Sequence, residues 1–448
     1  MRVLNFFKPA PHIEEIQDPE LVKKTYKYWR LRTFYAMYIG YALYYFTRKS
    51  FTFAMPALQT ELGLSKFELG LLGSILSLSY GASKFLSGIL GDKSNPRYFM
   101  SVGLILTGIF NLFFGMSSTL VAFAFFWGLN GWFQGWGWPG CAKLLTHWYS
   151  HSERGRWWSV WSTSHNIGGT LIPILVAFCA GQWGWRSGMY IPGIICIVSG
   201  LALMNRLRDT PQSLGLPSIE VFRSDYAGSQ VRETKETELS VKQILFEYVL
   251  RNKFIWILAG AQFFNGMIRT AVNDWSMLYL IEIKHYSVMD AGFCVCLFEV
   301  GGFCGMLAAG WSSDRFFNGR RNPINAIFTA MILGVLYLFS ELVLPFPAVD
   351  AMILFLFGFT IFGPQMLIGL AAAELSHKKA AATATGFAGC FAYLGAAMAG
   401  GPLGALVKAQ GWGSYLTTLC ICAMLGTLIV LPLWSIKVRE NDLKPAQE

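Results

Sequence analysis

The stretch Gly88-Ile-Leu-Gly-Asp-Lys93 returns as Gly310-Trp-Ser-Ser-Asp-Arg315, 222 residues further along a chain of 448 residues. Each copy follows an apolar run. Two weaker matches have nearly the same spacing, Pro139 with Pro364 and Gly184-Trp185 with Gly411-Trp412. An offset that stays close to half the chain length indicates an internal repeat, so the protein is expected to consist of two similar halves.

The composition indicates that both halves lie in a membrane. Hydrophobic residues make up 54% of the chain and charged residues only 14%, whereas about a quarter of an ordinary soluble protein is charged. A soluble domain could not cover so much apolar surface. Twelve membrane helices of about 20 apolar residues each would account for this number of apolar residues. This composition excludes a soluble enzyme, a disordered chain and a secreted disulfide scaffold.

Twelve apolar segments follow, six in each half. Their expected ranges are 33–58, 67–90, 98–116, 120–145, 157–180, 187–205, 254–282, 289–311, 324–344, 349–373, 380–407 and 414–435. We therefore predict an all-α integral membrane protein. It would have an N-terminal arm (1–32), a first six-helix half (33–205), a linker (206–253), a second half (254–435) and a tail (436–448). Halves repeated in this way are typical of transporters, whose binding site lies at the midplane.

The distribution of Lys and Arg predicts the orientation. Basic residues gather in the arm, the linker, the tail and the loops on their side of the membrane, whereas the opposite loops hold only Lys66, Arg186, Lys284 and Lys408. Cytoplasmic loops carry this excess. Both termini are therefore expected in the cytoplasm, and we predict a multi-pass protein of a bacterial cytoplasmic membrane. The net charge of +10 is then a topology signal and does not indicate nucleic-acid binding.

Among the cationic residues within the expected spans, we single out Arg48 and Lys49 in the first, Lys84 in the second and Arg269 in the seventh. A charge at the centre of a membrane helix opposes insertion by about 2.5–3.5 kcal/mol. Lys84 lies near a span end, where it could instead extend its ammonium group to the interface. For the two arginines we favour a functional role.

The repeat relates Arg48 to Arg269, because their separation of 221 residues matches that of the loop motifs. Two arginines at equivalent positions would repel each other unless an anion lay between them. A guanidinium group can bind phosphate through two parallel hydrogen bonds. The pair therefore predicts a phosphate-bearing ligand, with Lys49 and Lys84 adding positive charge.

Aromatic and polar residues near these cations extend the candidate site. Tyr41, Tyr45 and Arg48 share a helix face by their spacing, as do Asn265 and Arg269. The full set of additional ligand candidates is Tyr41, Tyr45, Tyr80, Trp138, Trp161, His165, Asn265 and Tyr393. For each aromatic residue the alternative is an ordinary role in the core or the interfacial belt, and for His165 it is a hydrogen bond between helices. Asp92 and Asp314, in the repeated loops, and the intramembrane Glu299 are gating or structural candidates.

No enzyme chemistry is indicated. Gly135-Trp-Gly-Trp-Pro-Gly140 matches the GxGxxG pattern, but a dinucleotide site also needs a preceding strand in a soluble βαβ unit. The nine cysteines form no CxxC pair and lie in apolar runs. We therefore expect no cofactor, no metal and no catalytic residues.

Several strings resemble a known family. The paired loops are similar to those of the major facilitator superfamily. More specific strings resemble its organophosphate:phosphate antiporters: Tyr44-Tyr-Phe-Thr-Arg-Lys49, Asn130-Gly-Trp-Phe-Gln-Gly-Trp-Gly-Trp138, His165-Asn-Ile-Gly-Gly169 and Arg208-Asp-Thr-Pro-Gln-Ser-Leu-Gly-Leu-Pro217. The resemblance covers essentially the whole chain. It implies that Arg48 and Arg269 grip the phosphate, and that Lys49, Lys84 and His165 line the same cavity.

Within that family, Thr47-Arg-Lys-Ser-Phe51 and Asn273-Asp-Trp275 resemble the hexose-phosphate branch and its sensors. The resemblance implies uptake of a sugar phosphate, with glucose 6-phosphate as the expected cargo, in exchange for inorganic phosphate. Hexose-phosphate transporters carry an aspartate and a lysine in the eleventh helix, and the stretch 391–401 has neither. A membrane sensor of external hexose phosphate, with a histidine kinase as partner, therefore remains the alternative.

Overall fold

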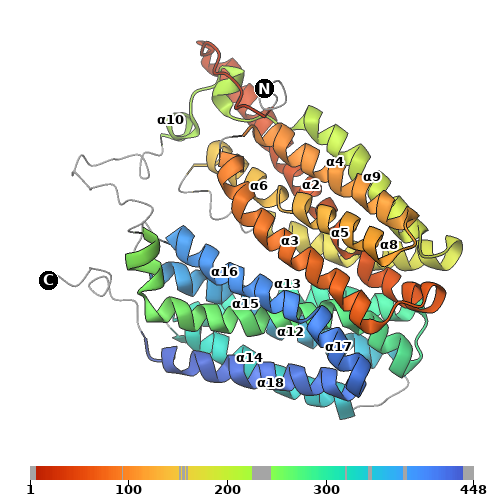
Figure 1. Ribbon diagram of the computed structural model, residues 1–448. Coiled ribbons are helices and arrows are strands. Elements are labelled where there is room, and N and C mark those ends of the chain that lie inside the picture. Colours follow the sequence, from red (N-terminus) through yellow and green to blue (C-terminus); the bar gives the residue numbers. More distant parts are fainter. Residues whose placement is uncertain are drawn as a thin grey trace. The chain divides into compact units, whose positions relative to one another are not determined.

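The computed structural model describes residues 7–92, 94–150, 153, 157, 160–224, 244–317, 320–341, 346–376 and 381–436, and every regular element in these ranges is helical (Figure 1). The helices of the first half are α2 (Pro19–Leu62), α3 (Lys66–Asp92), α4 (Pro96–Met116), α5 (Leu120–Gln134), α6 (Gly137–Trp148), α8 (Ser164–Trp183) and α9 (Ser187–Arg206). Short elements follow in the linker, η1 (Pro211–Leu214), α10 (Ile219–Arg223) and η2 (Ile244–Leu250).

The second half contains α12 (Lys253–Lys284), α13 (Val288–Phe317), α14 (Arg321–Glu341), α15 (Pro347–Glu374), α16 (Ala381–Met398), α17 (Gly401–Gln410), α18 (Trp412–Val430) and η4 (Leu431–Leu433). Each predicted span coincides with one of these helices or with a consecutive pair. Among the described residues, eight helices are long and apolar enough to cross a membrane. The prediction of an all-helical, multi-pass membrane protein is confirmed.

Three helix boundaries differ from the predicted spans. The first helix begins at Pro19, well before the predicted start at residue 33, because its first turns are polar and a hydropathy pattern cannot detect them. The fourth span is divided between α5 and α6 at Gly135-Trp136. The eleventh is divided between α16 and α17 at Ala399-Gly400, where Pro402 occupies the first turn of α17. Proline is well tolerated there because its missing N–H has no helical acceptor.

The chain forms two compact units. One comprises Met1–Phe51 with Ser79–Glu236, and the other comprises Thr52–Leu78 with Thr237–Glu448. The second unit thus includes the C-terminal end of α2 and the N-terminal end of α3, together with the turn that joins them. Gly63 in that turn has φ of +67°, a backbone conformation that glycine adopts without the steric cost of a Cβ atom.

Small residues allow helices to approach closely within each unit. In the second unit, Gly301 and Gly305 of α13 lie against the carbonyl oxygens of Phe355 and Phe359 in α15, where a Cβ atom would overlap the backbone. Gly108 of α4 and Gly193 of α9 make an equivalent contact in the first unit. Such packing is typical of helices in membranes, where close van der Waals contact replaces the hydrophobic effect.

The first part of the linker is packed on the first unit. The backbone N–H groups of Ile13 and Ile16 donate to the carbonyl oxygens of Gln212 and Gly215, at 3.2 and 2.8 Å. Tyr26 of α2 donates its hydroxyl to the Pro217 carbonyl at 2.6 Å, and burial raises the pKa of this hydroxyl, which keeps it protonated as a donor. Residues 207–217 are therefore a structural element of the first unit.

Candidate anion-binding site

Arg48 lies close to two tyrosine rings in the first unit. Its guanidinium carbon is 4.8 Å from the centre of the Tyr45 ring, on the same helix, and 4.0 Å from the centre of the Tyr80 ring, on α3. Aromatic faces attract guanidinium groups in this geometry. The adjacent Lys49 is only 5% exposed, with its nitrogen 5.9 Å from the Tyr45 ring. The structure thus brings together two of the predicted cations and two of the predicted tyrosines.

A row of serines sets the rotation of α3. The hydroxyls of three serines spaced by four residues donate to backbone carbonyls of α5 and its C-cap: Ser79 to Gly128, Ser83 to Trp132 and Ser87 to Gly135. Tyr80 and Lys84 each follow one of these serines by one residue, so they share the neighbouring face of the helix. The Lys84 nitrogen lies 5.3 Å from the Trp138 ring in α6.

Buried polar residues brace the turn of α2 that carries Arg48. Gln134 of α5 donates to the Tyr44 carbonyl and to the Thr47 hydroxyl, at 3.1 and 3.0 Å. Asn130, one turn earlier, donates to the Thr47 carbonyl at 3.1 Å. A buried hydrogen-bond network of this kind restricts the side chains to one arrangement. No role was predicted for Asn130 and Gln134 from the sequence, although two amides at i and i+4 in an apolar span are a signal for one.

α8 contributes His165 close to the same tyrosines. The His165 ring centre is 5.9 Å from that of Tyr45, and the fully buried Trp161 lies 4.9 Å from Tyr41. Gly168 lies against the Ala42 carbonyl of α2, and a Cβ atom there would overlap it. The glycine therefore allows α8 to approach α2 closely enough for these ring contacts.

α12 carries the candidates of the second unit. The Arg269 guanidinium carbon lies 5.3 Å from the ring centre of Phe362 in α15. Asn265, one turn earlier, is 2% exposed, and neither its amide nitrogen nor its oxygen has a hydrogen-bond partner within the described residues. A buried amide without partners is costly, so a ligand or water is expected to bind it.

Glycines also bring α16 against α12 near these residues. Gly266 lies against the Ala392 carbonyl, and Gly395 against the Phe263 carbonyl. The half-buried Tyr393 is therefore carried on the helix that packs beside Asn265. Glu299 is 2% exposed on α13. The side chains of Asp92 and Asp314 lie outside the described residues, so their gating role stays a prediction.

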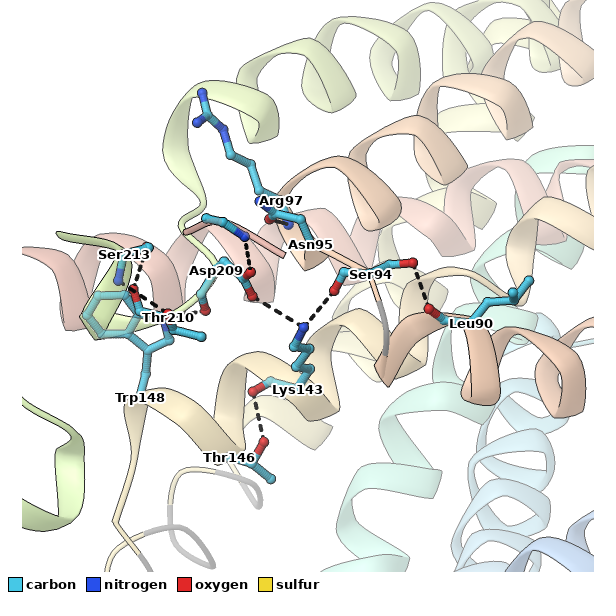
Figure 2. A network of polar contacts seen from close by, with 11 residues as sticks. Leu90, Ser94, Asn95, Arg97, Lys143, Thr146, Trp148, Asp209, Thr210 and Ser213 are labelled. Carbon is cyan, nitrogen blue, oxygen red and sulfur yellow. Dashed lines mark hydrogen bonds and ion pairs between the residues drawn. The ribbon is translucent and has the colours of Figure 1, made fainter. Parts of the chain in front are cut away.

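One further cation within a predicted span, Lys143, is largely buried. Lys143, in α6, forms an ion pair with Asp209 at 3.4 Å and donates to the Ser94 carbonyl at 2.7 Å (Figure 2). Asp209 is 1% exposed and also accepts from the Ala10 backbone N–H at 2.9 Å. Lys143 thus belongs to a structural network that binds the linker and the arm to α6, and it is not a ligand candidate.

The chain is similar to known proteins over most of its length. The family model for the Major Facilitator Superfamily matches residues 37–400. The chain belongs to this superfamily. A bacterial homologue of the human lysosomal transporter Spinster, solved in an inward-facing and occupied conformation, matches with a TM-score of 0.70 at 14% identity. That match covers 91% of this chain and 96% of the other, and it supports the fold alone.

Curated relatives match the chain almost from end to end. The "Probable hexose phosphate transport protein" of Chlamydia pneumoniae is 58% identical over 98% of both chains. The "Membrane sensor protein UhpC" of Escherichia coli is 47% identical, covering 96% of this chain and 98% of its own length. The "Glycerol-3-phosphate transporter" of Bacillus subtilis is 42% identical over 98% and 100%. The resemblance to the organophosphate:phosphate antiporter branch is confirmed.

Proposed function

We propose that this protein takes up a sugar phosphate, with glucose 6-phosphate as the expected cargo, in exchange for inorganic phosphate across a bacterial cytoplasmic membrane. Its 58% identity to a "Probable hexose phosphate transport protein" supports sugar-phosphate transport. The observation that carries the proposal furthest is Arg48, held 4.0 Å from the Tyr80 ring beside the buried Lys49. Cations inside an apolar helical bundle attract an anion.

In this proposal Arg48 and Arg269 grip the phosphate, as the family resemblance implies. Lys49, Lys84 and His165 add donors and positive charge. Asn265, whose buried amide has no partner within the described residues, binds a hydroxyl of the sugar. The tyrosine and tryptophan rings provide the apolar walls against which the sugar ring packs.

The same charges explain why transport is an exchange. A carrier that closed without an anion would enclose Arg48, Arg269 and the two lysines without a counter-charge, and burying an unpaired charge is strongly unfavourable. Any phosphate removes this penalty, so the carrier changes conformation when loaded in either direction. The excess of Lys and Arg on the side of the arm and linker supports cytoplasmic termini.

One observation favours a second candidate, a sensor of external hexose phosphate that acts on a membrane kinase. The chain is 47% identical to the "Membrane sensor protein UhpC", and the stretch 391–401 contains no charged residue. A sensor would bind the same ligands without sustained exchange. Binding without exchange in reconstituted vesicles would therefore support the sensor.

The test is competition for uptake of labelled phosphate by proteoliposomes loaded with unlabelled phosphate. We expect phosphate to exchange with itself and glucose 6-phosphate to compete. Free glucose should not compete, because hydroxyl hydrogen bonds of about 1 kcal/mol each cannot offset the loss of the phosphate. Competition by glucose at similar concentrations would contradict the proposal. A preference for glycerol 3-phosphate would assign the protein to another branch of the family.

A further inference from the structure

Four arginines gather where α2, α4 and α9 meet the linker: Arg32, Arg97, Arg206 and Arg208. Arg32 and Arg208 donate to the same backbone oxygen, that of Asn205, at 3.2 and 2.9 Å. A shared acceptor requires the two guanidinium groups to lie close together. Arg97, at the start of α4, donates to the neighbouring carbonyl of Met204. Three arginines from three separate segments therefore converge on the C-terminal turn of α9.

Aromatic rings hold these side chains in place. The Trp29 ring centre lies 4.7 Å from the guanidinium carbon of Arg32 and 4.4 Å from that of Arg208. Arg206 donates to the Tyr35 hydroxyl at 2.9 Å. Tryptophan and tyrosine are enriched at the boundary between membrane and water. The arginine cluster therefore lies at a level where lipid headgroups are expected.

No carboxylate among the described residues neutralises the positive charge of the cluster. Within the part of the chain that the structure describes, none of the four arginines pairs with a carboxylate. Asp209 follows Arg208 directly, but it pairs with Lys143 at 3.4 Å. Figure 2 shows the Arg97 guanidinium directed away from it. The arginines donate instead to carbonyl groups at the C-terminus of a helix. The partial negative charge there is only about half an elementary charge.

The arginines also affect one another electrostatically. Burial, followed by the nearby charges of Arg97 and Arg32, lowers the pKa of the Arg208 guanidinium from its ordinary value. Like charges held together in this way raise the free energy of the protein until an anion binds. A guanidinium group binds a phosphate through two parallel hydrogen bonds.

An apolar surface continues from the cluster along α2 and α9. Tyr28, Leu31, Tyr35 and Ile39 share one face of α2, whereas Val198, Leu201 and Asn205 share one face of α9. The two faces adjoin, because Arg32 on α2 also donates to the Asn205 side chain at 2.7 Å. Leu31 is 62% exposed and Leu201 57% exposed. Acyl chains would cover these side chains in a bilayer.

We propose that Arg32, Arg97, Arg206 and Arg208 form a binding site for the phosphate headgroup of an anionic phospholipid, whose acyl chains lie along α2 and α9. The lipid belongs to the leaflet on the side of the linker. The site is separate from the sugar-phosphate site, and the proposal does not depend on the identity of the transported compound.

The test is a lipid titration of the purified, delipidated full-length protein, followed by native mass spectrometry. The parent should bind phosphatidylglycerol in preference to phosphatidylcholine. The double variant Arg32→Gln/Arg208→Gln should lose about tenfold in affinity for phosphatidylglycerol, since each basic residue near the surface contributes to the attraction. The matched control is Lys23→Gln/Lys24→Gln, which removes the same charge from exposed positions of α2 and should change affinity less than twofold. Leu31→Ser should weaken lipid binding by removing an apolar contact with the acyl chains, while all four arginines are retained.

Three outcomes would overturn the proposal. Unchanged phosphatidylglycerol binding by the arginine variant would exclude a role for these side chains. An equal loss in the lysine control would reduce the effect to general electrostatic attraction. Displacement of phosphatidylglycerol by an equal concentration of inorganic phosphate, with no effect of Leu31→Ser, would show a site for a free phosphate. Retained phosphate exchange by the arginine variant would confirm that it is folded.

Discussion

Arg48 is held by contacts that a lysine could not reproduce. Its planar guanidinium group lies near the rings of Tyr45 and Tyr80, and a guanidinium group, unlike an ammonium group, can bind a phosphate through parallel hydrogen bonds. The network of Gln134, Asn130 and Thr47 fixes the backbone of the same turn. Position and chemistry therefore both favour an arginine at this residue.

We expect Arg48→Lys and Arg269→Lys each to lower phosphate exchange at least about tenfold, because lysine keeps the charge but loses the paired, charge-assisted hydrogen bonds. Exchange into proteoliposomes measures this, normalised to the amount of inserted protein. The matched control is Arg251→Lys, at an exposed position just before α12, which should exchange normally. Near-normal exchange by either of the first two variants would show that positive charge alone is sufficient.

Spacing along single helices could predict which residues share a face, and the partners across helices could not be predicted in this way. Tyr45 and Arg48 follow from helical periodicity. Phe362 lies 93 residues from Arg269, and Asp209 lies 66 residues from Lys143, so no local pattern connects either pair. Lys143 is an example. Whether a charge within an apolar span has a functional or a structural role depends on its partner, and only the structure identifies that partner.

At the scale of the helices, apolar runs located the spans well and their interruptions poorly. The division of the fourth span at Gly135-Trp136 leaves hydropathy unchanged, since both flanking helices are apolar. Signals were nevertheless present. Pro139 and Pro402 occupy the first turns of α6 and α17, where proline is favoured. The early start of α2 at Pro19 has the same signal in a polar segment.

We expect Gly301→Ala to destabilise the protein and Gly334→Ala to leave it nearly unchanged. A Cβ atom on Gly301 would overlap the Phe355 carbonyl of α15, whereas nothing lies within 4 Å of one on Gly334. Overpacking of this kind costs about 1–3 kcal/mol. Thermal unfolding in detergent would measure it as a lower Tm for Gly301→Ala alone. Equal Tm values for the two variants would mean that α13 and α15 can separate without cost.

For the whole molecule, the internal repeat and the compact units divide the chain differently. The repeat predicts halves that meet in the linker, but residues 52–78 pack within the second unit. Ser74 of α3 donates to the Ala397 carbonyl at 2.5 Å and accepts from the Gly401 N–H at 2.7 Å. A repeat identifies segments that are similar in sequence. It does not identify which segments are in contact in the folded structure. No sequence pattern relates Ser74 to either partner.

Glu282, near the end of α12, binds side chains of the same segment, residues 52–78. It forms an ion pair with Lys66 at 2.7 Å and accepts from Gln59 and Trp412, at 2.8 and 2.7 Å. Lys66 also lies 4.9 Å from the Trp412 ring. Gln59 and Lys66 flank the turn between α2 and α3. If transport requires the two halves to move against each other, these bonds must break and form again in each cycle.

We therefore expect Lys66→Glu to slow exchange with little change in equilibrium phosphate binding, because it replaces the ion pair by two like charges. The side chains are partly exposed, so loss of the pair should shift the conformational equilibrium by about 1 kcal/mol, or about fivefold. Exchange rates in proteoliposomes and phosphate affinity in detergent measure the two effects separately. The charge-swapped variant Lys66→Glu/Glu282→Lys restores the attraction and should recover most of the rate. If the swap is as slow as the single variant, or if phosphate affinity falls in parallel with the rate, the ion pair does not control the conformational change.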